Sequence, residues 1–211
     1  AEADFCTMVT RNGKIKRVPL VQFEAVRPSG LIAIGLSRGD VLGWVRLTLS
    51  GQGILIITAQ GQALRFSTDL VRPMGRSAAG VNAINLRQGD SVTGVEVVKE
   101  DGSQLLVVTS GGYGKRTPLS AYPAKGRATR GVATVARKLL PRTGPVVAVR
   151  SVLPDDQITI ITTNGQALRT SVSNIPQLGR ATMGNRLIRL GDDDTVASVA
   201  RLAASDVEVT L

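Results

Sequence analysis

The chain has 211 residues, 43% of them apolar and 20% charged, which is typical of a globular protein and unlike a disordered one. Its 26 Lys and Arg residues against 16 Asp and Glu give a formal net charge of +10, and the sequence pI is near 10.8. The absence of His excludes Cys-His and Ser-His-Asp catalytic sites, while the charge favours polyanionic partners.

The sequence predicts neither an internal disulfide nor a membrane segment. The single cysteine, Cys6, lies in an apolar run and is expected to be a buried, reduced thiol. No apolar run approaches the roughly 20 residues that span a bilayer, and the N-terminus lacks the features of a signal peptide. We therefore expect a cytoplasmic protein with no membrane partner, and a fragment of a longer chain, because a repeat begins almost at once without an initiating Met.

One pattern occurs four times along the chain. Each copy has an apolar, β-branched run that ends in Thr, at Thr10, Thr58, Thr109 and Thr162. A basic residue follows each Thr by seven places, at Arg17, Arg65, Arg116 and Arg169. A glycine recurs later in each copy, with Gly-Arg shortly before the last three, at Gly30, Gly80, Gly131 and Gly184. A period of about 50 residues indicates a repeat architecture.

The first repeat reads as four short strands. Residues 5–10 form the first predicted strand, and Asn12-Gly13 supplies a tight hairpin turn before the return strand. Third and fourth strands are predicted at 31–36 and 41–49, with Gly39-Asp40 as the turn between them. The second repeat follows the same order, with strands at 54–58, 63–67, 81–86 and 92–98.

The third and fourth repeats vary this order. The third has a glycine-rich turn at 111–114 and reads Leu140-Pro141 where the others have Gly-Asp. The fourth returns to the pattern, with strands at 166–170 and 186–190 and a Gly-Asp turn at Gly191-Asp192. The tail 203–211 ends in the alternating run V-E-V-T-L, which we interpret as a further strand.

These elements predict an all-β protein with a propeller-like array of four repeated four-stranded blades. The whole chain, 1–211, forms a single repeat domain, with blades at approximately 4–51, 52–102, 103–154 and 155–211. Each small sheet needs its neighbours to bury its faces. Whether the four units close into a ring or form an open arc is not decided by the pattern.

Little in the sequence supports catalysis. The Asp-rich turn 191–194 could be a Ca²⁺ or Mg²⁺ loop, but it lacks EF-hand spacing, and its alignment with the other Gly-Asp turns favours a structural role. Tyr113 and Tyr122 lie near turns, and nothing in the sequence activates either. We expect no catalytic residue and no metal site.

The repeated basic residues are the candidate binding residues, because equivalent positions in an array of like units lie on one continuous rim. Such a curved basic band suits a bent polyanion, whereas salt bridges or packing within the protein are the alternative. Few aromatic residues and no recognition helix favour contact with the duplex backbone. The candidate DNA-binding residues are Lys14, Lys16, Arg17, Arg27, Arg65, Arg76, Lys115, Arg116, Lys125, Arg127, Arg130, Arg169 and Arg180. Replacing Arg76, Arg127 and Arg180 with Glu is predicted to abolish duplex binding.

Four stretches carry a family resemblance across all repeats. They read G-L-I-A-I-G-L-S-R-G-D at 30–40, V-R-P-M-G-R-S-A-A-G-V at 71–81, G-Y-G-K-R-T-P-L-S-A-Y at 112–122 and G-R-A-T-M-G-N-R-L-I-R-L at 179–190. The chain resembles the C-terminal domains of bacterial DNA gyrase A and of its topoisomerase IV relative. The resemblance implies a β-pinwheel, commonly of six blades, of which this chain looks like the last four. The family's basic, glycine-rich box belongs to the first blade and is absent here.

The resemblance also implies a function. The basic perimeter of the pinwheel would wrap duplex DNA beside the cleavage core of a type II topoisomerase and support negative supercoiling. The implied partners are the remainder of the gyrase A polypeptide and the enzyme's ATPase subunit. The parent enzyme would use ATP and Mg²⁺, whereas no cofactor or catalytic residue is expected in this fragment. The alternatives are the topoisomerase IV counterpart and a protein-interaction propeller with an acidic partner.

Overall fold

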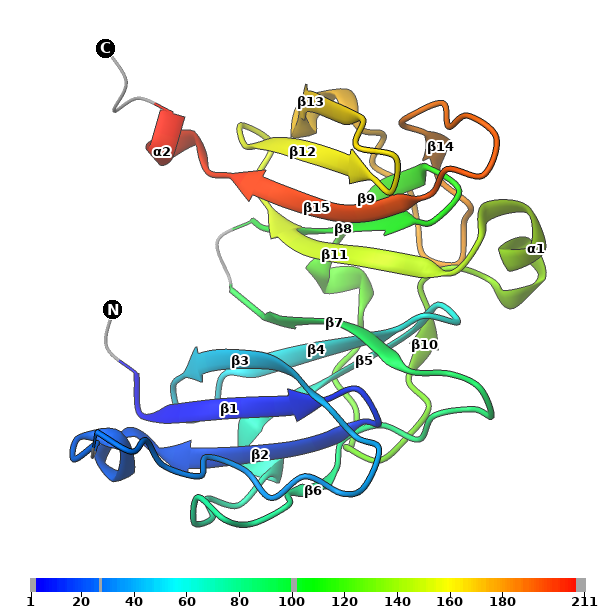
Figure 1. Ribbon diagram of the computed structural model, residues 1–211. Helices are drawn as coiled ribbons and strands as arrows, with labels where there is room; N and C mark the ends of the chain where they lie inside the picture. Colours follow the sequence, from blue (N-terminus) through cyan, green and yellow to red (C-terminus); the bar gives the residue numbers. More distant parts are fainter. Residues whose placement is uncertain (1–2, 27, 100–101, 208–211) are drawn as a thin grey trace.

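The computed structural model describes residues 3–26, 28–99 and 102–207 of the protein (Figure 1). Its regular secondary structure consists mainly of four antiparallel sheets of short strands. The first sheet has the order β3-β1-β2-β6, with β1 at Phe5–Thr10, β2 at Lys14–Pro19, β3 at Leu42–Thr48 and β6 at Val81–Asn82. The second has the order β7-β4-β5-β10, with β4 at Gly53–Thr58, β5 at Gln62–Ser67, β7 at Val92–Val97 and β10 at Val132–Ala133.

The third and fourth sheets repeat this arrangement. The third has the order β11-β8-β9-β14, with β8 at Gln104–Thr109, β9 at Tyr113–Pro118, β11 at Val146–Val152 and β14 at Asn185–Arg186. The fourth has three strands in the described part of the chain, in the order β15-β12-β13, with β12 at Gln157–Thr162, β13 at Ala167–Ser171 and β15 at Val196–Leu202. The predicted all-β pinwheel is confirmed.

The sheets do not coincide with the repeats of the sequence. The outermost strands β6, β10 and β14 each come from the repeat that follows the one forming the rest of the sheet. We predicted that the four strands of each repeat would form one sheet, and this is wrong for the third strand, which pairs with the preceding sheet. This strand is also only two residues long. In the first repeat the predicted strand at 31–36 has no regular strand structure. Neighbouring sheets are therefore joined by backbone hydrogen bonds as well as by packing.

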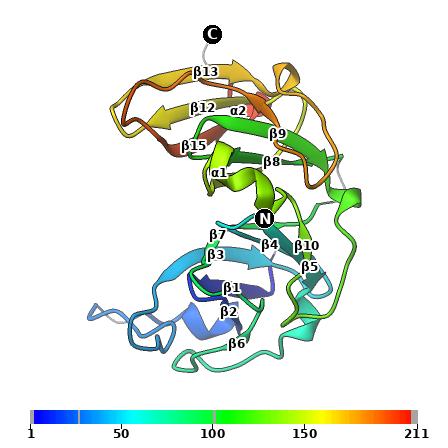
Figure 2. The same cartoon turned by 90° about the vertical axis from the view of Figure 1, so that its right-hand side faces the viewer.

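The innermost strands β3, β7, β11 and β15 connect the sheets, because β3 contacts β7, β7 contacts β11, and β11 contacts β15. Figures 1 and 2 show the four sheets following one another along an arc, with β2 and β13 near its opposite ends. The innermost strands also carry charged residues. Arg46 of β3 pairs with Glu96 of β7 at 3.5 Å, and Arg201 of β15 pairs with Asp156 at 2.7 Å.

Three apolar cores fill the spaces between adjacent sheets. The strand β4 is apolar throughout because it lies between two of these cores. Ile54 and Ile56 face the core shared with the first sheet, whereas Leu55 and Ile57 face the core shared with the third. All four are fully buried. A strand covered on both faces reads as a continuous apolar run rather than an alternating one.

Short helices complete the chain. One-turn 3-10 helices follow the second strand of each repeat, at Leu20–Phe23, Thr68–Leu70, Leu119–Ala121 and Val172–Asn174, and another is at Arg137–Leu139. The α-helices are α1 at Leu140–Thr143 and α2 at Ala204–Val207. In the tail, α2 ends at Val207, where the predicted strand V-E-V-T-L begins, and the rest of that run, residues 208–211, lies outside the described residues. Within the described ranges, no helix has the length and apolarity needed to cross a bilayer.

In each repeat, the segment before the last strand is hydrogen-bonded to the hairpin turn between the first two strands. The carboxylate of Asp40 accepts the backbone N–H of Asn12 at 3.0 Å, and that of Asp90 accepts the N–H of Gln60 at 2.9 Å. In the fourth repeat this acceptor is Asp194, not the Asp192 that we aligned with the others. In the third repeat, α1 places the carbonyl oxygen of Thr143 there, 2.8 Å from the N–H of Gly111.

Replacing Asp90 with Ala is expected to lower the free energy of unfolding by about 1–3 kcal/mol, because the N–H groups of Gln60 and Ser91 lose a charged acceptor. Urea denaturation at pH 7 measures the change. Asp155 is exposed in a turn, and Asp155→Ala is the matched control, with an expected change below about 0.5 kcal/mol. Similar losses in the two variants would contradict the assigned role of Asp90.

Candidate nucleic-acid interface

Three of the four arginines that follow the Thr residues by seven places bind the next repeat of the protein. The Nε of Arg17 donates to the carbonyl oxygen of Val71, and its Nη1 lies 3.0 Å from the carboxylate of Asp69. The Nη1 of Arg65 donates to the carbonyl oxygen of Leu119 at 3.2 Å. All of these acceptors lie in or directly after the 3-10 helix of the following repeat.

Arg116 repeats this contact in the third sheet. Its Nε donates to the carbonyl oxygen of Ile175 at 2.6 Å and its Nη2 to that of Ser173 at 3.3 Å. Arg169, at the equivalent place in the fourth sheet, is exposed and donates to Gln157 Oε1 at 2.6 Å. For Arg17, Arg65 and Arg116, the alternative to DNA binding is therefore correct: these arginines make contacts within the protein and hold neighbouring units together.

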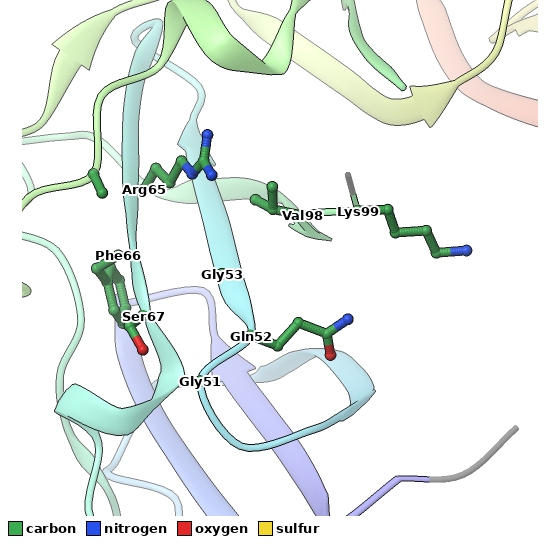
Figure 3. Close-up of a pocket in the computed structure, with 9 residues that line it drawn as sticks. Gly51, Gln52, Gly53, Arg65, Phe66, Ser67, Val98 and Lys99 are labelled. Carbon is green, nitrogen blue, oxygen red and sulfur yellow. The ribbon is translucent and has the colours of Figure 1, made fainter. Parts of the chain in front are cut away.

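Arg65 also borders an opening at one end of the second sheet. A hollow of about 560 Å³ is lined by Gly51, Gln52, Gly53, Arg65, Phe66, Ser67, Val98, Lys99 and Ala124. Figure 3 shows the side chains of Arg65 and Lys99 reaching in different directions from this hollow. The two cations do not converge on one point, so the hollow is not a built anion site.

The three candidate lysines on the second strands of the sheets also have partners within the protein. Lys14 donates to Asn82 Oδ1 of β6 at 2.7 Å. Lys16 and Lys115 are 0% and 1% exposed, which removes both from any surface that could contact phosphate. Burial lowers the pKa of both, and that of Lys115 falls to about 8, with the nearby Arg180 acting in the same direction.

The glycine-flanked loops are different, because they lie on the outside of the sheets. We call residues 75–80, 126–131 and 179–184 the rim loops. The residues just before them pair with the second strands, Pro73 with Arg17, Ala124 with Arg65 and Gln177 with Arg116. Each rim loop then leads into the strand that joins the preceding sheet.

The last residue of each rim loop must be glycine because of its backbone conformation and its close approach to the preceding sheet. Gly131 has a φ of +70°, and a Cβ there would lie 2.1 Å from the carbonyl oxygen of Ala63 in β5. Gly80 and Gly184 have the same conformation and the same close approach to the preceding sheet. Gly30 also has a positive φ but has nothing within 4 Å of its Cβ position. The recurring glycine thus marks where the chain passes from one sheet to the next.

Basic side chains of the rim loops reach solvent. Arg130 and Arg180 are exposed, Arg76 is partly buried, and none of them has a hydrogen bond or ion pair from its side chain within the described residues. Lys125 is exposed directly before the second rim loop. Arg127 differs, because its guanidinium binds two backbone carbonyl groups. Arg27 lies outside the described residues.

Arg72 is a further basic residue of this surface that the repeat pattern did not predict. It is exposed and lies on the same outer edge, three residues before the first rim loop. The repeat pattern does not reveal Arg72 because the other repeats have no basic residue at this place. The signal that could have found it is the composition of the whole segment, since 72–80, 123–131 and 176–184 contain no Asp or Glu.

The nucleophile-type side chains lack activating surroundings. Cys6 is only partly buried, unlike the buried thiol that we predicted, and this partial burial raises the pKa of the thiol. Burial also raises the pKa of the Tyr122 hydroxyl, which forms a hydrogen bond with Thr134 Oγ1 at 2.6 Å. A hydrogen bond from Arg186 lowers the pKa of Tyr113, but the tyrosine ring is buried beside that guanidinium. Within the described residues, no cluster of three or more Asp, Glu or Cys side chains could hold a metal ion.

Comparison with known proteins places the four repeats in one protein family. The model of the family described as "DNA gyrase C-terminal domain, beta-propeller" matches residues 4–47, 54–99, 103–152 and 156–203, one match for each repeat. The chain is 40% identical over 207 residues to the DNA gyrase A protein of Staphylococcus epidermidis, covering 98% of this chain and 23% of that protein. It is also 40% identical over 203 residues to the DNA gyrase A protein of Staphylococcus aureus, covering 96% and 23%. The chain thus spans less than a quarter of these relatives.

Two solved structures of C-terminal domains have the same fold as this chain. The C-terminal domain of DNA topoisomerase IV matches with a TM-score of 0.90 at 27% identity, covering 96% of this chain and 62% of that one. The C-terminal domain of DNA gyrase A matches with a TM-score of 0.85 at 27% identity, covering 96% and 67%.

Proposed function

From the premise that this chain belongs to the family of DNA gyrase C-terminal domains, we propose that its rim loops bind the backbone of duplex DNA and lead the duplex around the outside of the sheets. Binding would be independent of base sequence and would support negative supercoiling by the parent type II topoisomerase in the cytoplasm. The identity of 40% to two gyrase A proteins favours gyrase over topoisomerase IV as that parent.

One observation carries this proposal. The segments 72–80, 123–131 and 176–184 lie at the outer edge of successive sheets, and their charged residues are all Arg or Lys. Cations placed along an arc neutralise successive phosphates of a bent duplex and release its condensed counterions. Because small residues surround these cations, backbone N–H groups of the loops can approach phosphate oxygens as well.

The rim is suited to phosphates rather than bases. The described α-helices have four residues each, too short to serve as a recognition helix in the major groove. Aromatic residues are only 3% of the chain, so few side chains are available to stack on unpaired bases. The specificity that remains is for the shape and bendability of the duplex.

The parent enzyme would supply everything else in the reaction. We propose that the protein partners are the remainder of the gyrase A polypeptide and the enzyme's ATPase subunit. ATP and Mg²⁺ would act there rather than on this chain. No residue of this chain is assigned a catalytic role. Its contribution is the geometry in which the duplex is presented.

Binding to duplexes of increasing length across a salt series tests the proposal. We expect the affinity to rise with length until several sheets are spanned, because each additional rim loop adds contacts. The logarithm of the binding constant should fall linearly with the logarithm of the salt concentration, with a slope of about −0.9 for each phosphate contacted. Fluorescence anisotropy with labelled duplexes measures both.

Weak binding that depends on neither length nor salt would refute the proposal. The basic rim would then be structural or would meet an acidic protein. A single-stranded DNA of equal charge is the control, since a rim that guides a duplex should bind it less well.

A further inference from the structure

We propose that Lys16 and Lys115 are positioning residues, which anchor two of the rim loops from beneath and leave Arg76 and Arg180 available to phosphate, whereas Arg127 anchors the remaining loop itself. This inference rests on the proposed function. It divides the rim arginines, which look equivalent in the sequence, into two kinds.

The buried lysines hold the loops through their ammonium groups. The Nζ of Lys16 donates to the carbonyl oxygens of Arg76 and Ala78, the latter at 2.9 Å, and also to that of Ala33 at 2.9 Å. The Nζ of Lys115 donates to the carbonyl oxygen of Gly179 at 2.8 Å and to Thr182 Oγ1 at 3.0 Å. A buried ammonium group needs such acceptors, so each lysine and its loop stabilise one another.

The second sheet lacks this anchor. Leu64 occupies the place of Lys16 and Lys115, one residue before the repeated arginine, and it is fully buried in an apolar core. The rim loop above it is instead held by Arg127. Its Nε donates to the carbonyl oxygen of Leu70 at 3.1 Å and its Nη1 to that of Asn82 at 2.8 Å. Both acceptors belong to the neighbouring repeat.

The two arrangements give their arginines different tasks. Where a lysine anchors the loop, the guanidinium of Arg76 or Arg180 has no protein partner within the described part of the chain. The charge of Lys115 also lies close enough to Arg180 for the two to interact, since burial first and Arg180 second lower the pKa of the lysine. Where no lysine is present, Arg127 binds carbonyl groups, and the cations left for phosphate are Arg130 on that loop and Lys125 directly before it.

Single substitutions separate the two kinds of arginine. Arg180→Ala and Arg76→Ala should each make the salt slope of duplex binding shallower by about 0.9, with no shift of the urea unfolding midpoint. Arg127→Ala should leave the slope unchanged and lower the midpoint by roughly 0.5 M, because it removes two hydrogen bonds to carbonyl groups. Arg127→Ala that flattens the slope as much as Arg180→Ala would overturn the inference.

Lys115→Met tests the anchor directly. It should flatten the salt slope about as much as Arg180→Ala, and the double variant Lys115→Met/Arg180→Ala should flatten it no further. Leu64→Met is the matched control at the equivalent place and should leave the slope unchanged. If Lys115→Met does not fold, the contrast between Arg180→Ala and Arg127→Ala decides alone.

The outcomes distinguish this inference from the function on which it rests. If the unsubstituted chain does not bind duplex DNA, the proposed function fails and the inference fails with it. If the chain binds with a salt-dependent affinity but Arg76, Arg127 and Arg180 contribute equally, or if the Lys115→Met and Arg180→Ala effects add, the inference alone fails.

Discussion

Replacing Arg76, Arg130 and Arg180 together with Glu is expected to weaken duplex binding by at least about 100-fold at 0.1 M salt. Three lost phosphate contacts make the salt slope shallower by about 2.7, and each contact is worth close to a factor of ten between 0.1 and 1 M salt. The new carboxylates add repulsion. Arg127 is not included because its guanidinium already binds carbonyl groups. Anisotropy titrations with a labelled duplex measure the change.

The control separates the rim from net charge. Arg11, Arg38 and Arg189 are also exposed, but they lie in turns or loops outside the rim segments. Replacing these three with Glu changes the net charge by the same amount, and we expect a much smaller loss of affinity. Equal losses in the two triple variants would show that overall charge, and not the rim, governs binding.

Gly131→Ala is expected to destabilise the protein by more than about 3 kcal/mol. A non-glycine residue at a φ of +70° costs about 1–2 kcal/mol, and the added Cβ would meet the carbonyl oxygen of Ala63 at 2.1 Å. The backbone there cannot yield without separating β10 from β5. Urea denaturation measures the total loss, and hydrogen exchange at the Val132 and Ala133 amides should show local opening.

Gly30→Ala is the matched control for this prediction. Gly30 occupies the same place in the first repeat, with a φ of +76°, but its Cβ position has nothing within 4 Å. We expect a cost of about 1–2 kcal/mol from the backbone conformation alone. If the two glycine variants lose equal stability, the contact between sheets contributes nothing to the requirement for glycine.

The repeat pattern predicted the fold class, but not how the strands are shared. Apolar runs such as 54–58 are recognisable because neighbouring sheets cover both of their faces. By contrast, Val81–Asn82 is two residues long, and no local pattern tells which sheet it joins. The recurring glycines held part of that information, since Gly80, Gly131 and Gly184 each combine a positive φ with a close approach to the backbone of the preceding sheet.

The candidate site was predictable only in part. A basic residue that repeats looks the same in a sequence whether it binds phosphate or a carbonyl group of the next repeat. The structure separates the two, because the acceptors of Arg17 and Arg116 lie far away in the sequence. The sequence does carry one signal of this difference, because Lys16 and Lys115 alternate with Leu64 and Leu168 at equivalent places, which indicates two kinds of loop support.

The exchange of outer strands also has a consequence for synthesis. A sheet receives its last strand only when the next repeat has left the ribosome, so that β5, for example, keeps an unpaired edge until Val132–Ala133 has been made. Folding therefore follows translation with a delay of one repeat. During that delay each nascent sheet exposes an edge that can pair with another chain. Because β6, β10 and β14 have only two residues each, few backbone N–H and C=O groups at each sheet edge depend on the next repeat for a hydrogen-bond partner.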